Sequence, residues 1–251
     1  MNLSEQLEQT NQLIANRTLR TVSNQEILQL IDLTLLSNTA TEEDILHLQH
    51  TGSNLDVASI CILPNHLSSL SYPRPFKTAT VINFPTGNNP QNEVEQSILQ
   101  VINQYKIDEI DYVFPYQNYV NGNKELALSL CKRNYQLCKQ HNITFKVILE
   151  TGALPSAEYI YTLSREVIRQ GCDFIKTSTG KIAVGATIES AFAMLQAIKD
   201  SELLCGFKAS GGIKTKAQAL EYIHLAECVL NRSISNDWFR LGASNLITDL
   251  L

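Results

Sequence analysis

Five charged side chains lie within short apolar stretches of the sequence. Parallel strands that are covered on both faces are usually almost continuously apolar, so these charges are unexpected there. Because an isolated buried charge is costly, the five groups must pair with one another or change one another's proton affinity. The pattern therefore predicts a compensated cluster of two acids and three lysines, formed by Asp32, Asp111, Lys146, Lys176 and Lys208.

Two buried lysines beside a carboxylate suit Schiff-base chemistry. An amine at its ordinary pKa of ~10.4 is protonated at neutral pH and cannot attack a carbonyl. Burial and a neighbouring ammonium both disfavour the charged form and lower the pKa toward ~7–8. A carboxylate such as Asp111 would supply the proton transfers that imine chemistry needs. The alternative is that the lysines form structural ion pairs and have no catalytic role.

Glycine-rich segments follow three of the apolar stretches. They are Thr177-Ser178-Thr179-Gly180-Lys181, Ser210-Gly211-Gly212-Ile213-Lys214 and Gly242-Ala243-Ser244-Asn245. Glycine lets backbone N–H groups approach an anion, and a helix that begins nearby adds its positive end. Each segment alone could be an ordinary turn. Together, with Lys181 and Lys214 beside them, they favour a phosphate site and a small phosphorylated substrate.

Short β-branched runs alternate with longer helical patterns from about residue 30 onward. We expect strands at 30–34, 55–63, 76–84, 109–114, 143–150, 172–177, 203–209 and 238–241. We expect helices at 41–50, 89–105, 123–140, 156–170, 187–199 and 215–229, and a last one from Ser244. Thr41, Ser156 and Thr187 have the side chains of helix N-caps, and Gly171 is a helix stop.

Eight strand–helix units without a linker predict a closed (β/α)₈ barrel, a TIM barrel, in the α/β class. We expect one domain over residues 1–251, in which residues 1–28 form one extra helix over the bottom or side of the barrel. A doubly wound open sheet is the alternative. Barrel enzymes often bind phosphate through the loops after strands 7 and 8, where two of the glycine-rich segments fall.

Composition narrows the function classes. The 251 residues carry 20 basic and 25 acidic side chains, a net charge of -5, which argues against nucleic acid or an anionic membrane as partner. We see no signal peptide, and no run reaches the ~18–20 apolar residues of a membrane span. We therefore expect a cytoplasmic protein with reduced, buried cysteines. His47 and His50 are three residues apart, but we expect them to be surface residues and predict no metal.

Motifs along the chain resemble the deoxyribose-phosphate aldolases, class I aldolases built on this barrel. The resemblance covers residue 30 to the C-terminus. The motifs are Ile31-Asp32-Leu33-Thr34, Ser59-Ile60-Cys61-Ile62, Asn83-Phe84-Pro85-Thr86-Gly87, Asp111-Tyr112-Val113-Phe114-Pro115-Tyr116, Lys146-Val147-Ile148-Leu149-Glu150-Thr151-Gly152, Phe174-Ile175-Lys176-Thr177-Ser178-Thr179-Gly180-Lys181, Gly206-Phe207-Lys208-Ala209-Ser210-Gly211-Gly212 and Leu241-Gly242-Ala243-Ser244.

This resemblance implies cleavage of 2-deoxy-D-ribose 5-phosphate to acetaldehyde and D-glyceraldehyde 3-phosphate, in deoxyribonucleoside catabolism, without a cofactor. It implies that Lys176 forms the Schiff base, that Lys208 tunes it and that Asp111 is the acid of the proton relay. Asp32 matches a polar residue of the same network. The residues that match phosphate and sugar contacts are Thr179, Gly180, Lys181, Gly211, Gly212, Gly242 and Ser244. Relatives also suggest a homodimer.

Three departures from the family pattern stand out. Ala209-Ser210 replaces the common Pro-Ala, Asn245 replaces a second serine but keeps an amide donor, and no tail ending in tyrosine follows Leu251.

Two rival functions remain open. One is a Schiff-base barrel lyase with another phosphosugar, and the other is a non-catalytic phosphosugar-binding barrel.

Overall fold

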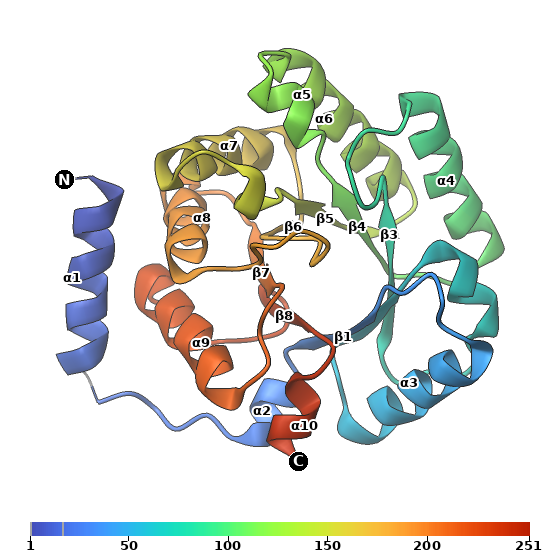
Figure 1. Cartoon of the computed structure of the whole chain (residues 1–251), viewed down its shortest axis with the longest axis horizontal. Helices are drawn as coiled ribbons and strands as arrows, with labels where there is room; N and C mark the ends of the chain where they lie inside the picture. Colours follow the sequence, from blue (N-terminus) through green and yellow to red (C-terminus); the bar gives the residue numbers. More distant parts are fainter. Residues whose placement is uncertain (1, 17) are drawn as a thin grey trace.

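The protein is a closed barrel of parallel strands surrounded by helices, as the sequence predicts (Figure 1). The computed structural model describes residues 2–16 and 18–251. Within these ranges, each strand pairs in parallel with the next, and β1 closes the barrel against β8. The eight described strands are β1 (Ile31–Leu35), β2 (Ser59–Ile62), β3 (Lys77–Ile82), β4 (Glu109–Val113), β5 (Thr144–Ile148), β6 (Phe174–Lys176), β7 (Gly206–Ser210) and β8 (Phe239–Ala243).

Helices cover the outside of this barrel (Figure 1). They are α1 (Leu3–Asn16), α2 (Asn24–Leu28), α3 (Glu42–Leu55), α4 (Gln91–Gln104), α5 (Tyr116–Val120), α6 (Lys124–Gln140), α7 (Ala157–Gln170), α8 (Ile188–Ser201), α9 (Lys216–Leu230) and α10 (Leu246–Leu250). Two short 3-10 helices, η1 (Pro64–Ser69) and η2 (Thr151–Ala153), complete the connections. Across the described ranges, no helix is both long enough and apolar enough to span a bilayer.

Local signals set most helix boundaries. The hydroxyls of Thr41, Ser156 and Thr187 each accept a hydrogen bond from a backbone N–H in the first turn, so the three predicted N-caps are confirmed. Gly171 ends α7 at a φ of 108°, a conformation that suits glycine.

The expectation of eight strand–helix units is wrong in one place. The β2–β3 connection carries the 3-10 helix η1 in place of an α-helix. Pro64 opens it, and Pro73 and Pro75 follow closely. Proline lacks an N–H and clashes with the preceding helical turn, so a regular α-helix cannot continue through this segment. The helix α5, which lies between β4 and α6, is an addition that the sequence patterns did not predict.

The predicted extra N-terminal helix is confirmed as α1, but it does not extend over residues 1–28. A second, short helix follows it, because a capping box between Ser23 and Glu26 starts α2 after an extended stretch. The helix α1 lies on the side of the barrel, against α9 and α8 (Figure 1). Residues 1 and 17 lie outside the described residues.

Candidate active site

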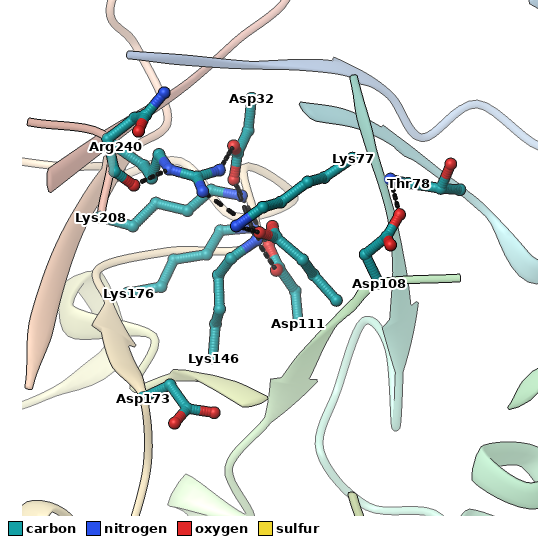
Figure 2. Close-up of polar contacts among 12 residues, drawn as sticks. Asp32, Lys77, Thr78, Asp108, Asp111, Lys146, Asp173, Lys176, Lys208 and Arg240 are labelled. Carbon is teal, nitrogen blue, oxygen red and sulfur yellow. Dashed lines mark hydrogen bonds and ion pairs between the residues drawn. The ribbon is translucent and has the colours of Figure 1, made fainter. Parts of the chain in front are cut away.

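Strand register brings the predicted charged residues together inside the barrel. Lys176 on β6 is the Cα partner of Lys208 on β7, and Asp111 on β4 is the partner of Lys146 on β5. Side chains at paired positions of neighbouring strands point to the same face of a sheet. The five predicted side chains therefore converge in the barrel interior (Figure 2).

Asp111 lies at the centre of this group. Its Oδ2 accepts a hydrogen bond from Lys176 Nζ at 2.8 Å and another from Lys208 Nζ at 2.8 Å. Lys146 Nζ donates to Asp111 Oδ1 at 3.0 Å. All four side chains are buried. The structure therefore places the two lysines of the predicted pair on one carboxylate oxygen.

Asp32 forms a second bridge within the cluster. Its Oδ2 accepts hydrogen bonds from Lys208 and, at 3.1 Å, from Lys146. Its Oδ1 accepts one from Arg240 Nη1 at 2.6 Å. Arg240 also donates to Glu109 Oε1 at 3.2 Å, and Lys146 forms an ion pair with Glu109. The sequence analysis missed Arg240 and Glu109 as members of this cluster.

The cluster shifts the pKa values of Lys176 and Lys208 in opposite directions. Burial is the main cause that lowers the pKa of Lys176, and the Lys208 ammonium lowers it further, while the Asp111 carboxylate opposes both. Burial also disfavours the charge on Lys208, but Asp111 and Asp32 outweigh it, so the pKa of Lys208 is raised. Lys176 is thus the amine that loses its proton most readily, and Lys208 remains an ammonium.

Both aspartates are held as carboxylates. Burial alone would raise the pKa of Asp111, but the three lysine side chains around it outweigh burial and lower it. The pKa of Asp32 is likewise lowered well below its usual range, by Lys146, Lys208 and Arg240 against burial. Asp111 therefore begins as a proton acceptor, and it can act as an acid only after it has taken up a proton.

A cavity of about 220 Å³ opens above the cluster, at the carboxyl ends of the strands. Lys176 lines its floor, and the three glycine-rich segments form its walls. Of the residues predicted to bind substrate, all but Asp32 line this cavity, namely Thr179, Gly180, Lys181, Gly211, Gly212, Gly242, Ser244 and Asn245. The described lining does not include Asp32, Asp111 or Lys208, which lie deeper in the barrel.

The glycines of the β7 loop are required by its geometry. Gly211 and Gly212 have φ angles of 89° and 90°, which side chains other than glycine rarely adopt. The Gly185 backbone also lies so close to Gly211 that a Cβ on Gly185 would be 2.4 Å from the Gly211 carbonyl oxygen. The loops after β6 and β7 therefore pack backbone against backbone beside the cavity.

The family comparison agrees with this architecture. The model of the DeoC/LacD family aldolases matches residues 26–228. The chain belongs to this family of aldolases.

Solved structures resemble this aldolase over most of its length. Deoxyribose phosphate aldolase from Aeropyrum pernix is 26% identical, with a TM-score of 0.78, and the match covers 97% of this chain and 94% of that one. A Coccidioides immitis protein proposed to be a deoxyribose-phosphate aldolase is 24% identical, with a TM-score of 0.79 and the same coverage of both chains. A Toxoplasma gondii protein with the same proposed activity is 19% identical, with a TM-score of 0.80, and covers 90% of this chain and 92% of that one. The last two likenesses support the fold alone.

Ser210 is one of the departures from the family pattern, and the structure gives it a role in this aldolase. Its Oγ donates to the Ser178 carbonyl oxygen at 2.6 Å, and its N–H donates to Thr177 Oγ1 at 2.9 Å. Thr177 Oγ1 in turn donates to the Ser210 carbonyl oxygen at 3.0 Å. These bonds tie the end of β7 to the loop after β6, on the wall of the cavity.

Glu150 is a buried acid to which the sequence analysis gave no role. It accepts hydrogen bonds from the Thr179 hydroxyl and, at 3.2 Å, from the Thr179 backbone N–H. The Thr179 hydroxyl oxygen accepts the Lys181 backbone N–H at 3.1 Å, so Glu150 holds the loop that lines the cavity. Burial raises the pKa of Glu150, although the two bonds from Thr179 oppose the rise.

Other chemically suggestive residues lie outside this site. His50 is a hydrogen-bond partner of Asn54 on the exposed face of α3. Within the described ranges, no three histidine, cysteine, aspartate or glutamate side chains are grouped to hold a metal ion. All six cysteines are free, and five of them are buried. Tyr112 stacks on Phe145, so its ring belongs to the core packing.

Proposed function

We propose that this aldolase cleaves 2-deoxy-D-ribose 5-phosphate to acetaldehyde and D-glyceraldehyde 3-phosphate through a Schiff base on Lys176. The observation that carries the proposal is the shared contact of Lys176 and Lys208 with Asp111 Oδ2, both at 2.8 Å. This arrangement places an amine of lowered pKa at the floor of the cavity, with a proton acceptor and an ammonium group in contact beneath it.

The first stage is imine formation. The neutral Lys176 amine attacks the C1 aldehyde of the open-chain sugar, which gives a carbinolamine that loses water to form an iminium ion. The neighbouring Asp111 carboxylate and Lys208 ammonium would accept and donate the protons that this step moves. The iminium carries the positive charge that a neutral amine lacked, and Asp111 at 2.8 Å from the nitrogen stabilises it.

Carbon–carbon cleavage follows. A base removes the proton of the C3 hydroxyl, the C2–C3 bond breaks, and its electron pair moves toward the iminium to form an enamine. Carbons 3 to 5 leave as D-glyceraldehyde 3-phosphate. A proton is then added to C2 of the enamine, and water hydrolyses the acetaldehyde imine to restore Lys176. One proton leaves the C3 hydroxyl and one enters C2, and the water lost in the first stage is replaced in the last.

The phosphate would occupy the glycine-rich end of the cavity. The same 220 Å³ space is lined by Lys176 at one end and by Gly212, Ser244 and Lys181 at the other, so one small phosphosugar can reach both. Lys181 Nζ donates to the Leu36 carbonyl oxygen at 2.7 Å, which holds its positive charge at the cavity wall. Backbone N–H groups and a lysine are typical phosphate ligands.

The deciding experiment is a coupled assay for glyceraldehyde 3-phosphate, with deoxyribose 5-phosphate and ribose 5-phosphate supplied in parallel. We expect a kcat/KM for the deoxy sugar at least about 100-fold higher, because the 2-hydroxyl of ribose would need room and a partner beside the reacting carbons. Preferential cleavage of another phosphosugar would reassign the substrate within the family. Binding of the sugar without any turnover would leave a phosphosugar-binding barrel.

Two controls separate the covalent step from the phosphate contacts. Borohydride added with substrate should label Lys176 irreversibly and leave a Lys176→Ala variant unlabelled. Lys181→Met should raise KM for the phosphorylated sugar by about 10-fold or more with a smaller change in kcat, because it removes binding energy far from the reacting bond. The cytoplasmic location, the role in deoxyribonucleoside catabolism and the homodimer stay predictions.

A further inference from the structure

The ion-paired cluster extends well below the substrate cavity. Arg240 bridges Asp32 and Glu109 through its two terminal nitrogens, at 2.6 and 3.2 Å. Neither Arg240 nor Glu109 is among the described residues that line the substrate cavity. Both line a second cavity, of about 360 Å³. The first residue of each strand from β3 to β7 lines this cavity, as does Arg240, the second residue of β8, so the cavity lies at the opposite end of the barrel. Figure 2 shows Arg240 joining the cluster from β8.

The buried charges do not balance if every group is ionised. The cluster contains the carboxylates of Asp32, Glu109 and Asp111 and the cationic side chains of Lys146, Lys176, Lys208 and Arg240. All seven side chains are at most 3% exposed. Three anions face four cations, and an unbalanced buried charge is costly. Loss of one proton makes the cluster neutral.

The ion pairs indicate which cation gives up that proton. Among the described residues, Lys176 pairs with Asp111 alone. Lys208 pairs with two carboxylates, those of Asp32 and Asp111. Lys146 pairs with three, because it contacts Glu109 as well as Asp32 and Asp111. Arg240 pairs with Asp32 and Glu109 and, as a guanidinium, does not deprotonate. Lys176 is therefore the member whose charge is least compensated.

Other titratable groups near Lys176 stand outside these ion pairs. Cys61 on β2 faces the cluster, and burial raises the pKa of its thiol to about 11, so it is neutral at pH 7. Glu150 follows β5 and is bound by Thr179. Lys77 is the exception, because it forms an ion pair with Glu109 at 3.6 Å, but its side chain is 52% exposed and therefore hydrated. Glu109→Gln removes this exposed pair as well, whereas Cys61 and Glu150 are unchanged in the variants considered below.

We propose that Arg240 and Glu109 are positioning residues, whose opposite charges at the far end of the barrel determine whether the Lys176 amine is charged. The proposal rests on the proposed function, in which neutral Lys176 forms the Schiff base. Arg240 acts through Asp32 on Lys208, and Glu109 acts through Lys146 on Asp111, so neither needs to touch the substrate. The charge on Lys176 is thus a property of the whole cluster.

The two residues have opposite expected effects. Arg240→Met removes a cation, so the remaining cluster favours the Lys176 ammonium, and imine formation should shift to higher pH. Glu109→Gln removes an anion, so it disfavours the ammonium, and imine formation should shift to lower pH. We expect each shift to be roughly 0.5–1 pH unit, a 3- to 10-fold change in adduct at a pH below the midpoint. A purely structural role would lower activity in both variants without opposite shifts.

The experiment is reductive trapping of acetaldehyde on the full chain with borohydride over a range of pH. The adduct on Lys176 is measured by peptide mass spectrometry, with the exposed Lys199 as internal reference for the reagent. Arg240→Lys keeps the charge and should keep the wild-type midpoint. The double variant Arg240→Met with Glu109→Gln removes one charge of each sign and should return the midpoint toward wild type.

Each outcome decides between the claims. Opposite shifts of the single variants, with restoration in the double variant, support the proposal. If Arg240→Met does not fold, an acid shift in Glu109→Gln together with an unshifted Arg240→Lys supports it in the same way. Adduct formation with no shift, or with shifts of the same sign, overturns the proposal and leaves the proposed function intact. Absence of any adduct on Lys176 in the wild type refutes the proposed function and this inference with it.

Discussion

The interior of the barrel has an apolar side and a charged side. On β2 and β3, Cys61, Ala79 and Val81 pack with Leu36 and Leu63 into a small cluster of their own, separate from the main hydrophobic core. The strands β4 to β8 and β1 instead contribute carboxylates, lysines and an arginine to the same interior (Figure 2). The two sides meet between β3 and β4, where Val81 is the Cα partner of Asp111.

The contrast between the two sides separates two causes of the lysine pKa shifts, burial and neighbouring carboxylates. Burial disfavours the charge on Lys146, Lys176 and Lys208 alike, and it is the largest influence on the pKa of each. Yet the pKa of Lys176 is lowered and those of the other two are raised, because the carboxylates are unequally shared. The apolar side excludes water and strengthens every interaction, whereas the charged side selects the lysine that becomes a nucleophile.

Loss of the selected amine should have the largest effect. In Lys176→Met we expect turnover to fall by about 10⁴-fold or more and borohydride trapping to disappear, because the raised pKa values of Lys146 and Lys208 keep those amines protonated. Lys199→Met, on the exposed end of α8, is the matched control and should retain activity. Substantial turnover in the Lys176 variant would assign the covalent step to another residue.

Removal of the carboxylate of Asp111, which three lysines share, should disrupt the ion pairs on the charged side. Asp111→Asn leaves three lysines without their common anion, so we expect a loss of about 3–5 kcal/mol in the free energy of unfolding. Turnover should fall by about 10²- to 10³-fold through loss of proton transfer. Because an anion is removed from beside Lys176, its amine should still form an adduct, and at lower pH than in the wild type.

Trapping and turnover measured on the same preparation test this prediction. Thermal unfolding gives the stability change, and a preserved adduct with impaired cleavage shows that cleavage depends on Asp111 more strongly than imine formation does. If trapping and turnover vanish together in a folded variant, Asp111 is required for the imine itself.

Lys208→Leu should have an intermediate effect with a defined sign. The ammonium of Lys208 lowers the pKa of Lys176, so its removal raises that pKa and leaves less neutral amine at pH 7. We expect imine formation at pH 7 to fall by about 10- to 100-fold and the optimum to move to higher pH. A pH–rate profile checks this, and an unchanged profile would remove Lys208 from the tuning role.

The sequence was sufficient to predict the barrel and the convergence of its lysines. In a buried parallel strand any charge is conspicuous, and equal positions on neighbouring strands lead to one space, as for Lys176 and Lys208. Arg240 and Glu109 were not predicted as members of the cluster, because they lie at strand starts, where a charged residue is usually solvated. A period of two was the available signal, since Glu109 precedes Asp111 and Arg240 precedes Gly242 by two residues.

The differences from the predicted fold have local and non-local causes. The 3-10 helix η1 has a local cause, the prolines of the β2–β3 connection, whereas other features depend on tertiary packing. The position of α1 is one of these, because α1 packs against α9 and α8 without a buried residue of its own. Ion-pair partners are likewise set by closure of the barrel, which brings Asp32 on β1 beside Arg240 on β8.

The smallest effect should come from the apolar side. The Cys61 thiol has a pKa raised to about 11, chiefly by burial, so it carries no charge near neutral pH. Cys61→Ala therefore removes volume but no charge, and we expect the pH midpoint of imine trapping to move by less than about 0.3 units. The free energy of unfolding should fall by about 1 kcal/mol through the small void that remains. A midpoint shift as large as that of Lys208→Leu would mean that the thiol takes part in the charge balance, and the division between the two sides of the barrel would then be wrong.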